Sequence, residues 1–248
     1  MNLTIRRPDD FHCHFRWDDR LETVLGFTAR VFGRALDMPN WKIEGHPWGT
    51  EAIPWAPGVR AQDVLKHRAM IQTLCQIDGC NFEPVGCMYI TEQTTPVMIG
   101  EAARAGIRAC KTFFRGVSTN SGWGVRDPLS TEHRLLLTAM ADHNLVNSMH
   151  VEKPESFIMD AESEALGVFE RIVNDFPSLN SVFEHYSSLD HLEHFASENG
   201  AEFYGLPLNE GIITLVKRPW EVPAEYNGIV PFLAGETLDW QVEGVDFS

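Results

Sequence analysis

Short β-rich runs alternate with longer stretches of helical period along this chain, and this alternation constrains its fold more than any other feature. A strand followed by a helix, repeated, is the pattern of βα units that build a parallel sheet. The predicted strands lie near residues 10–14, 34–38, 85–91, 107–112, 145–150 and 179–185. We therefore expect six βα units in the first 185 residues.

Helix signals fall between these strands. Asp18 precedes a run of leucine and valine, Pro96 opens a run that ends at Gly106, and Ser130 precedes the apolar residues 135–140. The segment 160–175 also has helical spacing. After His185, residues 190–199 look helical and 204–248 mix short apolar runs with Pro and Gly, so no seventh unit is evident. The expected fold is α/β, an incomplete TIM-type (β/α) barrel with about six parallel strands and an irregular C-terminal tail.

An open barrel exposes two strand edges, which proteins usually cover or pair. We expect one domain over 1–248 in which the C-terminal helix and tail, 186–248, pack on the barrel. The apolar run 211–216, GIITLV, is a candidate filler of the gap with strand propensity. A second chain could also cover the edges, which favours a homodimer.

Charge and cysteine content exclude several classes of partner. Twenty Lys and Arg against 35 Asp and Glu give a net charge of -15, so neither nucleic acid nor a membrane is an expected partner. The five cysteines form no C-x-x-C pair and are odd in number, which suits a reducing cytoplasm. No apolar run is long enough to span a membrane and the first ten residues lack a signal-peptide core, so we expect a cytoplasmic protein.

Residues able to hold a metal stand at predicted strand ends. His12 and His14 flank Cys13, so period 2 points both imidazoles to one side, although such a pair alone is a weak metal signal. Lys111, His150 and His185 end the fourth, fifth and sixth strands, where active sites of α/β barrels are built. A protonated lysine cannot bind a cation, so Lys111 would need carboxylation to a carbamate.

Motifs spread over nearly the whole chain resemble the class II dihydroorotases of the metal-dependent amidohydrolase superfamily. They are, in order, RRPDDFHCHFR, ALDMPN, KTFF followed by STNSGWGV, SMHVE, VFEH, NGAEFYGLPLNE and VPFLAGET. The resemblance implies a zinc hydrolase of pyrimidine biosynthesis that interconverts dihydroorotate and N-carbamoyl-L-aspartate.

The resemblance also implies a site with two Zn²⁺ per chain. His12, His14 and carboxylated Lys111 would hold one ion, and the Lys111 carbamate, His150 and His185 the other. Arg16 and Asn40 would bind the substrate carboxylate, as a guanidinium fork can. Ser118 and Thr119 would close over substrate from a mobile loop. Gly116 and Trp123 depart from the family pattern there, having replaced Asn and His.

The family's catalytic aspartate has no counterpart in this sequence. In the family it lies after the eighth strand in a motif resembling G-T-D-S-A-P-H, and here the chain passes from His185 almost directly to the last helix. Asp190 is a poor replacement, because its surroundings do not match the motif and a helix N-cap is its ordinary role. Three alternatives stay open: a dihydroorotase with weak or lost activity, a hydantoinase-like hydrolase, and a non-catalytic relative that binds metal or a partner.

The other histidines lie outside this predicted site. His46 belongs to a loop rich in Pro and Trp and has no assigned role. The rest are expected at the surface, on helices or loops away from the barrel mouth. They are His67, His133, His143, His191 and His194.

Overall fold

A computed structural model gives the fold and describes residues 2–17, 20–42, 49–150, 152, 161–183 and 192–247. Its elements, in chain order, are β1 Asn2–Arg6, β2 Asp9–Cys13, α1 Arg20–Val31, β3 Arg34–Asp37, α2 Ala61–Asp78, β4 Glu83–Ile90, α3 Pro96–Arg104, β5 Ala109–Phe113, α4 Thr131–Asp142, β6 Val146–His150, α5 Ala161–Asp175, β7 Ser181–Phe183, a π-helix His194–Asn199, α6 Gly200–Phe203, β8 Ile212–Glu221 and β9 Thr237–Asp246.

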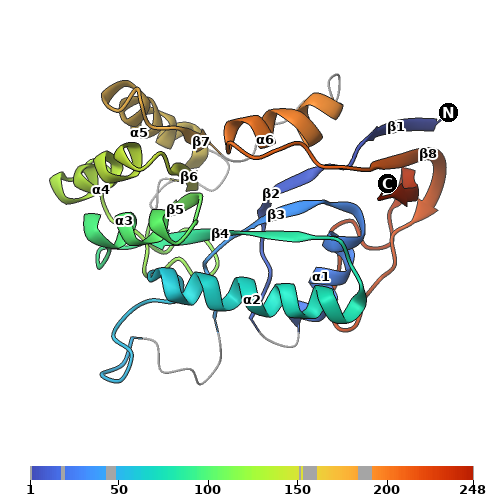
Figure 1. Cartoon of the computed structure of the whole chain (residues 1–248), viewed down its shortest axis with the longest axis horizontal. Helices are drawn as coiled ribbons and strands as arrows, with labels where there is room; N and C mark the ends of the chain where they lie inside the picture. The colour runs from blue at the N-terminus through green and yellow to red at the C-terminus, as the bar shows by residue number, and fades with distance from the viewer. Residues whose placement is uncertain are drawn as a thin grey trace.

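Six parallel strands form one curled sheet in the order β2-β3-β4-β5-β6-β7, which is half of a barrel (Figure 1). Each strand pairs with the next one along the chain, as βα units require. The predicted incomplete TIM-type barrel is confirmed, and so is the position of every predicted strand to within a few residues.

Helices cover the outer face of this sheet (Figure 1). Met88, Ile90 and Cys110 point outward and pack with buried residues of the helices, Leu137 and Met140 of α4 among them. Helices α3 and α4 begin where the sequence predicts, since the side chains of Thr95 and Ser130 accept hydrogen bonds from Met98 N and His133 N. Helix α2 was not predicted.

The inner face of the half-barrel is covered by the C-terminal segment. Leu36, Val85 and Ala109 are buried there in one cluster with Tyr204, which follows α6. The Tyr204 ring stacks on Phe11 of β2 at a centroid distance of 4.4 Å and an interplanar angle of 7°. One aromatic side chain from the tail thus fills part of the interior that missing strands leave open.

The apolar run 211–216 takes a different place from the one predicted. It lies in and just before β8, which pairs antiparallel with β1 and β9 in a separate three-stranded sheet. That sheet lies at one end of the molecule, beside both chain termini (Figure 1). The prediction of a strand was right, but the prediction that this strand fills the barrel gap was wrong.

Candidate functional site

The predicted metal-binding residues that the structure describes lie at the carboxyl ends of β2, β5 and β6, on the inner face of the half-barrel. Lys111 on β5 lies opposite Tyr89 on β4 and Ser148 on β6. His150 follows Ser148 by two residues, so both side chains share the face that Lys111 occupies. His12 lies on β2, and His14 directly after its last residue.

The imidazoles of His12 and His14 converge. Nε2 of His12 lies 3.2 Å from Nε2 of His14, with ring centroids 5.1 Å apart. Burial, and after it the charges of His12, Arg16 and Lys111, lower the pKa of His14 to about 3. His14 is therefore neutral at pH 7, so one of its two ring nitrogens carries a lone pair.

Lys111 is completely buried on the same face. Desolvation lowers the pKa of its ammonium group to about 7, against a smaller opposing influence of Cys87. Its Nζ lies 4.8 Å from the centroid of the Phe113 ring. At neutral pH a large share of this amine is unprotonated, which is the form that reacts with carbon dioxide.

His150 ends β6 and bonds to a carboxylate that the sequence analysis did not single out. Its Nε2 lies 2.9 Å from Oε1 of Glu152, and its ring centroid lies 6.0 Å from that of Phe113. The sequence held one signal for this contact, because Glu152 stands two residues after His150, a predicted metal ligand. His185 and Asp190 fall outside the described residues.

Asn40 is buried between the imidazole of His14 and the loop that carries Ser118 and Thr119. Its Oδ1 lies 2.9 Å from His14 Nδ1, and its Nδ2 donates to the Thr119 carbonyl over 2.7 Å. The Ser118 hydroxyl is buried and has no hydrogen-bond partner within the described chain. Asn40, Ser118 and Thr119, predicted as substrate-binding residues, thus lie together beside His14.

Arg16 follows His14 by two residues, and its backbone carbonyl is bound by a buried histidine. His67 of α2 lies with Nε2 3.2 Å from the Arg16 carbonyl oxygen and with Nδ1 2.6 Å from the Asp37 carboxylate. His67 is fully buried, so the prediction that it lies at the surface was wrong. The rings of Trp17 and Trp41 pack against it at 4.6 and 4.4 Å.

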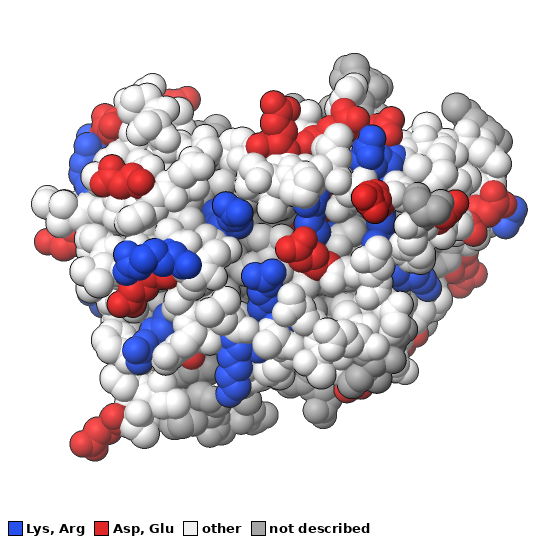
Figure 2. Space-filling model, viewed as in Figure 1, with Lys and Arg blue, Asp and Glu red and all other residues white. Residues whose placement is uncertain are grey.

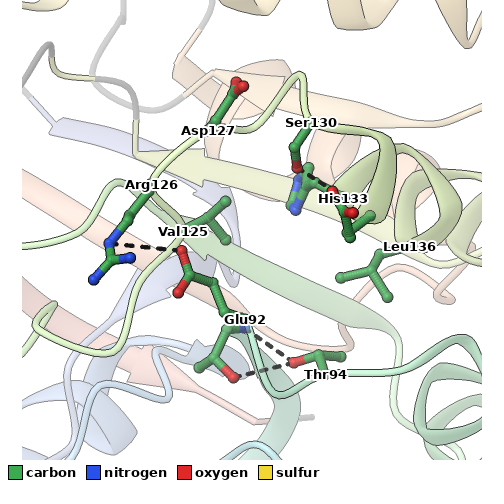
Figure 3. A pocket seen from close by; sticks show the side chains of 10 residues that line it. Glu92, Thr94, Val125, Arg126, Asp127, Ser130, His133 and Leu136 are labelled. Carbon is green, nitrogen blue, oxygen red and sulfur yellow. Dashed lines mark hydrogen bonds and ion pairs between the residues drawn. The ribbon is translucent and has the colours of Figure 1, made fainter.

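A second concavity opens outside the barrel, between the β4–α3 loop and the start of α4 (Figure 3). It has a volume of about 320 Å³ and is lined by Glu92, Arg126, Asp127 and His133 among others. His133 is 2 % exposed, which corrects the prediction of a surface position. Neither of its ring nitrogens has a hydrogen-bond partner among the described residues, and desolvation lowers its pKa to about 4.

The donor set on the inner face fits zinc. Two imidazole nitrogens bound tetrahedrally to one zinc ion at about 2.0–2.1 Å lie about 3.4 Å apart, and the His12–His14 separation of 3.2 Å is close to this. Within the described residues, no three His, Cys, Asp or Glu side chains gather as a metal site.

Figure 2 shows acidic and basic side chains interspersed over one face. None of the helices that the structure describes is both long and apolar enough to cross a membrane.

Curated relatives of this chain are dihydroorotases. The enzyme of Shewanella loihica is 29% identical over 356 positions that cover 97% of this chain and 99% of the relative, and that of Neisseria gonorrhoeae is 28% identical with the same coverage. The alignment exceeds the 248 residues of this chain by 108 positions, so the relatives contain at least that many residues without a counterpart here. The predicted resemblance, in a shortened form, is confirmed. No family model matches the chain.

Solved structures give the same fold. A dihydroorotase from Campylobacter jejuni superposes with a TM-score of 0.81 at 22% identity, covering 98% of each chain. A dihydroorotase from Saccharomyces cerevisiae in complex with 5-fluoroorotic acid superposes with a TM-score of 0.82 at 19% identity, again over 98% of each.

Proposed function

We propose that this chain, a shortened dihydroorotase-like amidohydrolase, binds zinc on the inner face of its half-barrel and binds a small carboxylate substrate beside it. The observation that carries the proposal is the 3.2 Å approach of His12 Nε2 and His14 Nε2 next to the buried Lys111. His150 and, outside the described residues, His185 complete the proposed ligand set.

Lys111 would hold zinc as a carbamate, bridging two ions. The lowered pKa supports this, because with a pKa of about 7 roughly half of the amine is neutral at pH 7, and the neutral amine adds to carbon dioxide without first losing a proton. Burial then favours a carbamate only if cations neutralise it, so carboxylation and zinc binding support each other.

The substrate would be dihydroorotate or N-carbamoyl-aspartate, with its carboxylate bound by Arg16. The yeast structure holds 5-fluoroorotic acid, a pyrimidine carboxylate, and the proposal extends a ligand of that class to this chain. A guanidinium binds a carboxylate through two parallel hydrogen bonds. The Ser118 hydroxyl, buried and without a partner in the described chain, is a further candidate donor.

Ring opening should be slow. Zinc in such a site supplies Lewis-acid activation of water and of the amide carbonyl, but proton transfer to the leaving nitrogen needs a positioned acid. Loss of a general acid and base costs about 10²- to 10⁴-fold in rate. The family's aspartate motif has no counterpart here, so we propose activity well below that of a complete enzyme.

The second candidate is a relative that binds metal or a partner without catalysis. It is favoured because the aspartate motif of the family has no counterpart in this sequence. Both candidates share the zinc site, so metal content cannot separate them. Turnover can.

The test pairs zinc content by elemental analysis with loss of dihydroorotate absorbance, for the wild-type chain and for His150→Ala. Bound zinc with turnover that His150→Ala abolishes supports the weak enzyme and excludes the non-catalytic relative. Bound zinc without turnover reverses that conclusion. A metal-free wild-type protein, purified with zinc and bicarbonate, would refute the zinc site itself. Turnover of hydantoin but not of dihydroorotate would point to a hydantoinase-like specificity.

A further inference from the structure

Asn40 stands at the junction of two parts of the proposed site. Its side chain contacts His14, while Thr119 and Asn120 belong to the loop between β5 and α4. The Asn40 side chain bonds to His14 through its amide oxygen and to the Thr119 carbonyl through its amide nitrogen. In addition, Asn120 Nδ2 donates to the backbone carbonyl of Asn40 over 3.0 Å. Two hydrogen bonds therefore join residues about 80 positions apart in sequence, and a third joins Asn40 to His14.

The chemistry of these bonds fixes which atom faces which partner. The Thr119 carbonyl can only accept, so the Asn40 nitrogen must face it and the Asn40 oxygen must face His14. Because an amide oxygen can only accept, His14 must donate from Nδ1. The lone pair of neutral His14 is then on Nε2, the atom that faces His12.

Burial makes this arrangement hard to replace. Asn40 is 3 % exposed, so water has little access to its amide. The hydroxyl of Tyr89 donates to the Asn120 carbonyl over 3.3 Å and adds a contact between the inner face of the barrel and the loop. If the loop moved away, the Asn40 amide would lose the partner that sets its orientation.

We propose that Asn40 is a positioning residue: one amide both holds His14 in the tautomer that offers Nε2 to a metal and holds the 118–121 loop against the barrel. The proposal rests on the zinc site proposed above. It assigns Asn40 a structural link between metal affinity and loop position, besides the predicted contact with the substrate carboxylate.

The link has a measurable consequence. A metal on His14 favours the Nδ1–H tautomer, which strengthens the hydrogen bond to Asn40 and in turn the hold on Thr119. Coupling between two sites is reciprocal. Zinc binding should therefore slow hydrogen exchange of the backbone amides in 116–124, although none of these residues is a proposed ligand.

Two substitutions at Asn40 separate the roles. Asn40→Ala removes both bonds, whereas Asn40→Asp keeps an acceptor for His14 Nδ1 and loses the donor to Thr119. Zinc affinity is measured by competition with a chromophoric chelator, and exchange in 116–124 by mass spectrometry with and without zinc. Circular dichroism of each variant checks that the protein is folded.

For Asn40→Ala we expect zinc affinity to fall about 10- to 100-fold, the usual effect of losing a residue that orients a metal ligand. Loop exchange should be fast, and zinc should no longer slow it. For Asn40→Asp we expect zinc affinity to be at least that of the wild-type chain, with fast loop exchange. If Asn40→Ala does not fold, the Asn40→Asp result alone decides the loop role.

Failures of the two proposals look different. Unchanged zinc affinity in Asn40→Ala, with the wild-type chain binding zinc, would overturn the positioning role and leave the zinc site standing. Unchanged loop exchange in both variants would overturn the hold on the loop. A wild-type chain that binds no zinc would defeat the proposed function, and with it the metal half of this inference.

Discussion

His67 and Asp37 form a buried pair in which Nδ1 lies 2.6 Å from Oδ2, and both side chains are at most 5 % exposed. His67 Nε2 reaches the Arg16 carbonyl, which can only accept, so that nitrogen carries a proton. Desolvation raises the pKa of Asp37, while His67 opposes the rise. The pair thus shares its remaining proton and fixes the backbone next to the predicted metal ligands.

Removing one partner of this pair should be costly. His67→Ala leaves a buried carboxyl group without its main partner, and we expect a loss of about 3–5 kcal/mol in the free energy of unfolding. Urea denaturation measures it. The matched control is His194→Ala, because His194 is exposed and pairs with Glu198 one turn away. A loss of about 0.5 kcal/mol is expected there, and equal losses in both variants would contradict the role of the buried pair.

Removing the buried imidazole of His133 on α4 should stabilise the protein at low pH. The folded-state pKa of His133, about 4, lies below the ordinary value of 6.5. The unfolded chain therefore binds more protons between pH 6.5 and 4, and stability is lost as pH falls through that window. His133→Leu removes this loss and an unsatisfied buried group, so its melting temperature should exceed that of the wild-type chain most at pH 4–5.

Leu135→Ala on the exposed face of α4 is the control for that comparison, since Leu135 is 57 % exposed. It should shift the melting temperature equally little at pH 5 and pH 7. A wild-type chain and a His133→Leu variant with the same pH profile would mean that His133 does not titrate in this way.

Gly33 leaves room for the side chain of Asn209 in the C-terminal segment. A Cβ at this position would lie 2.4 Å from the side chain of Asn209, which donates to Asp9 and to the Arg7 and Pro8 carbonyls. Gly33→Ala should therefore displace Asn209 at a cost of about 1–3 kcal/mol. In a double-mutant cycle measured by urea denaturation, Gly33→Ala should cost far less once Asn209→Ala is present. Additive losses would show that the two positions do not interact.

Zinc should stabilise the folded chain. At a free zinc concentration of 100 times the dissociation constant, binding adds about 2.7 kcal/mol, equivalent to a rise of roughly 5–10 °C in melting temperature for a chain of this size. His12→Asn should abolish the rise measured by differential scanning fluorimetry. Magnesium, which prefers oxygen ligands, should give little stabilisation, and an equal rise in His12→Asn would place the zinc elsewhere.

The sheet was predictable because its strands β3 to β6 are compact runs of mostly buried residues. Residues 83–90 and 109–113 are buried almost throughout, and such runs bounded by turn residues are readable from sequence. Helix α2 was missed because its buried stripe consists of Val64, His67, Ile71 and Cys75, and an imidazole interrupts the apolar pattern. Its N-cap, Arg60, makes no capping hydrogen bond from its side chain either.

The sequence predicted which residues belong to the candidate site better than it predicted the contacts between them. Lys111, His12 and His14 could be found from strand ends, but the burial of His67 depends on Asp37, thirty residues away, and on two indole rings. The Asn40–Thr119 bond likewise joins distant segments. The metal-ligand and substrate-binding roles stay predictions, as do the single domain over 1–248, the homodimer and the cytoplasmic location.

The pairing of β1 with β8 sets the order in which this chain can fold during synthesis. Thr4 and Thr214 are cross-strand neighbours separated by 210 positions. At about 5–20 residues per second, a ribosome needs roughly 10–40 s to produce the partner after β1 has been made. The first strand, with Leu3 and Ile5, must wait through that interval with its backbone unpaired, so a nascent chain of this protein is an expected client of chaperones that bind extended apolar segments.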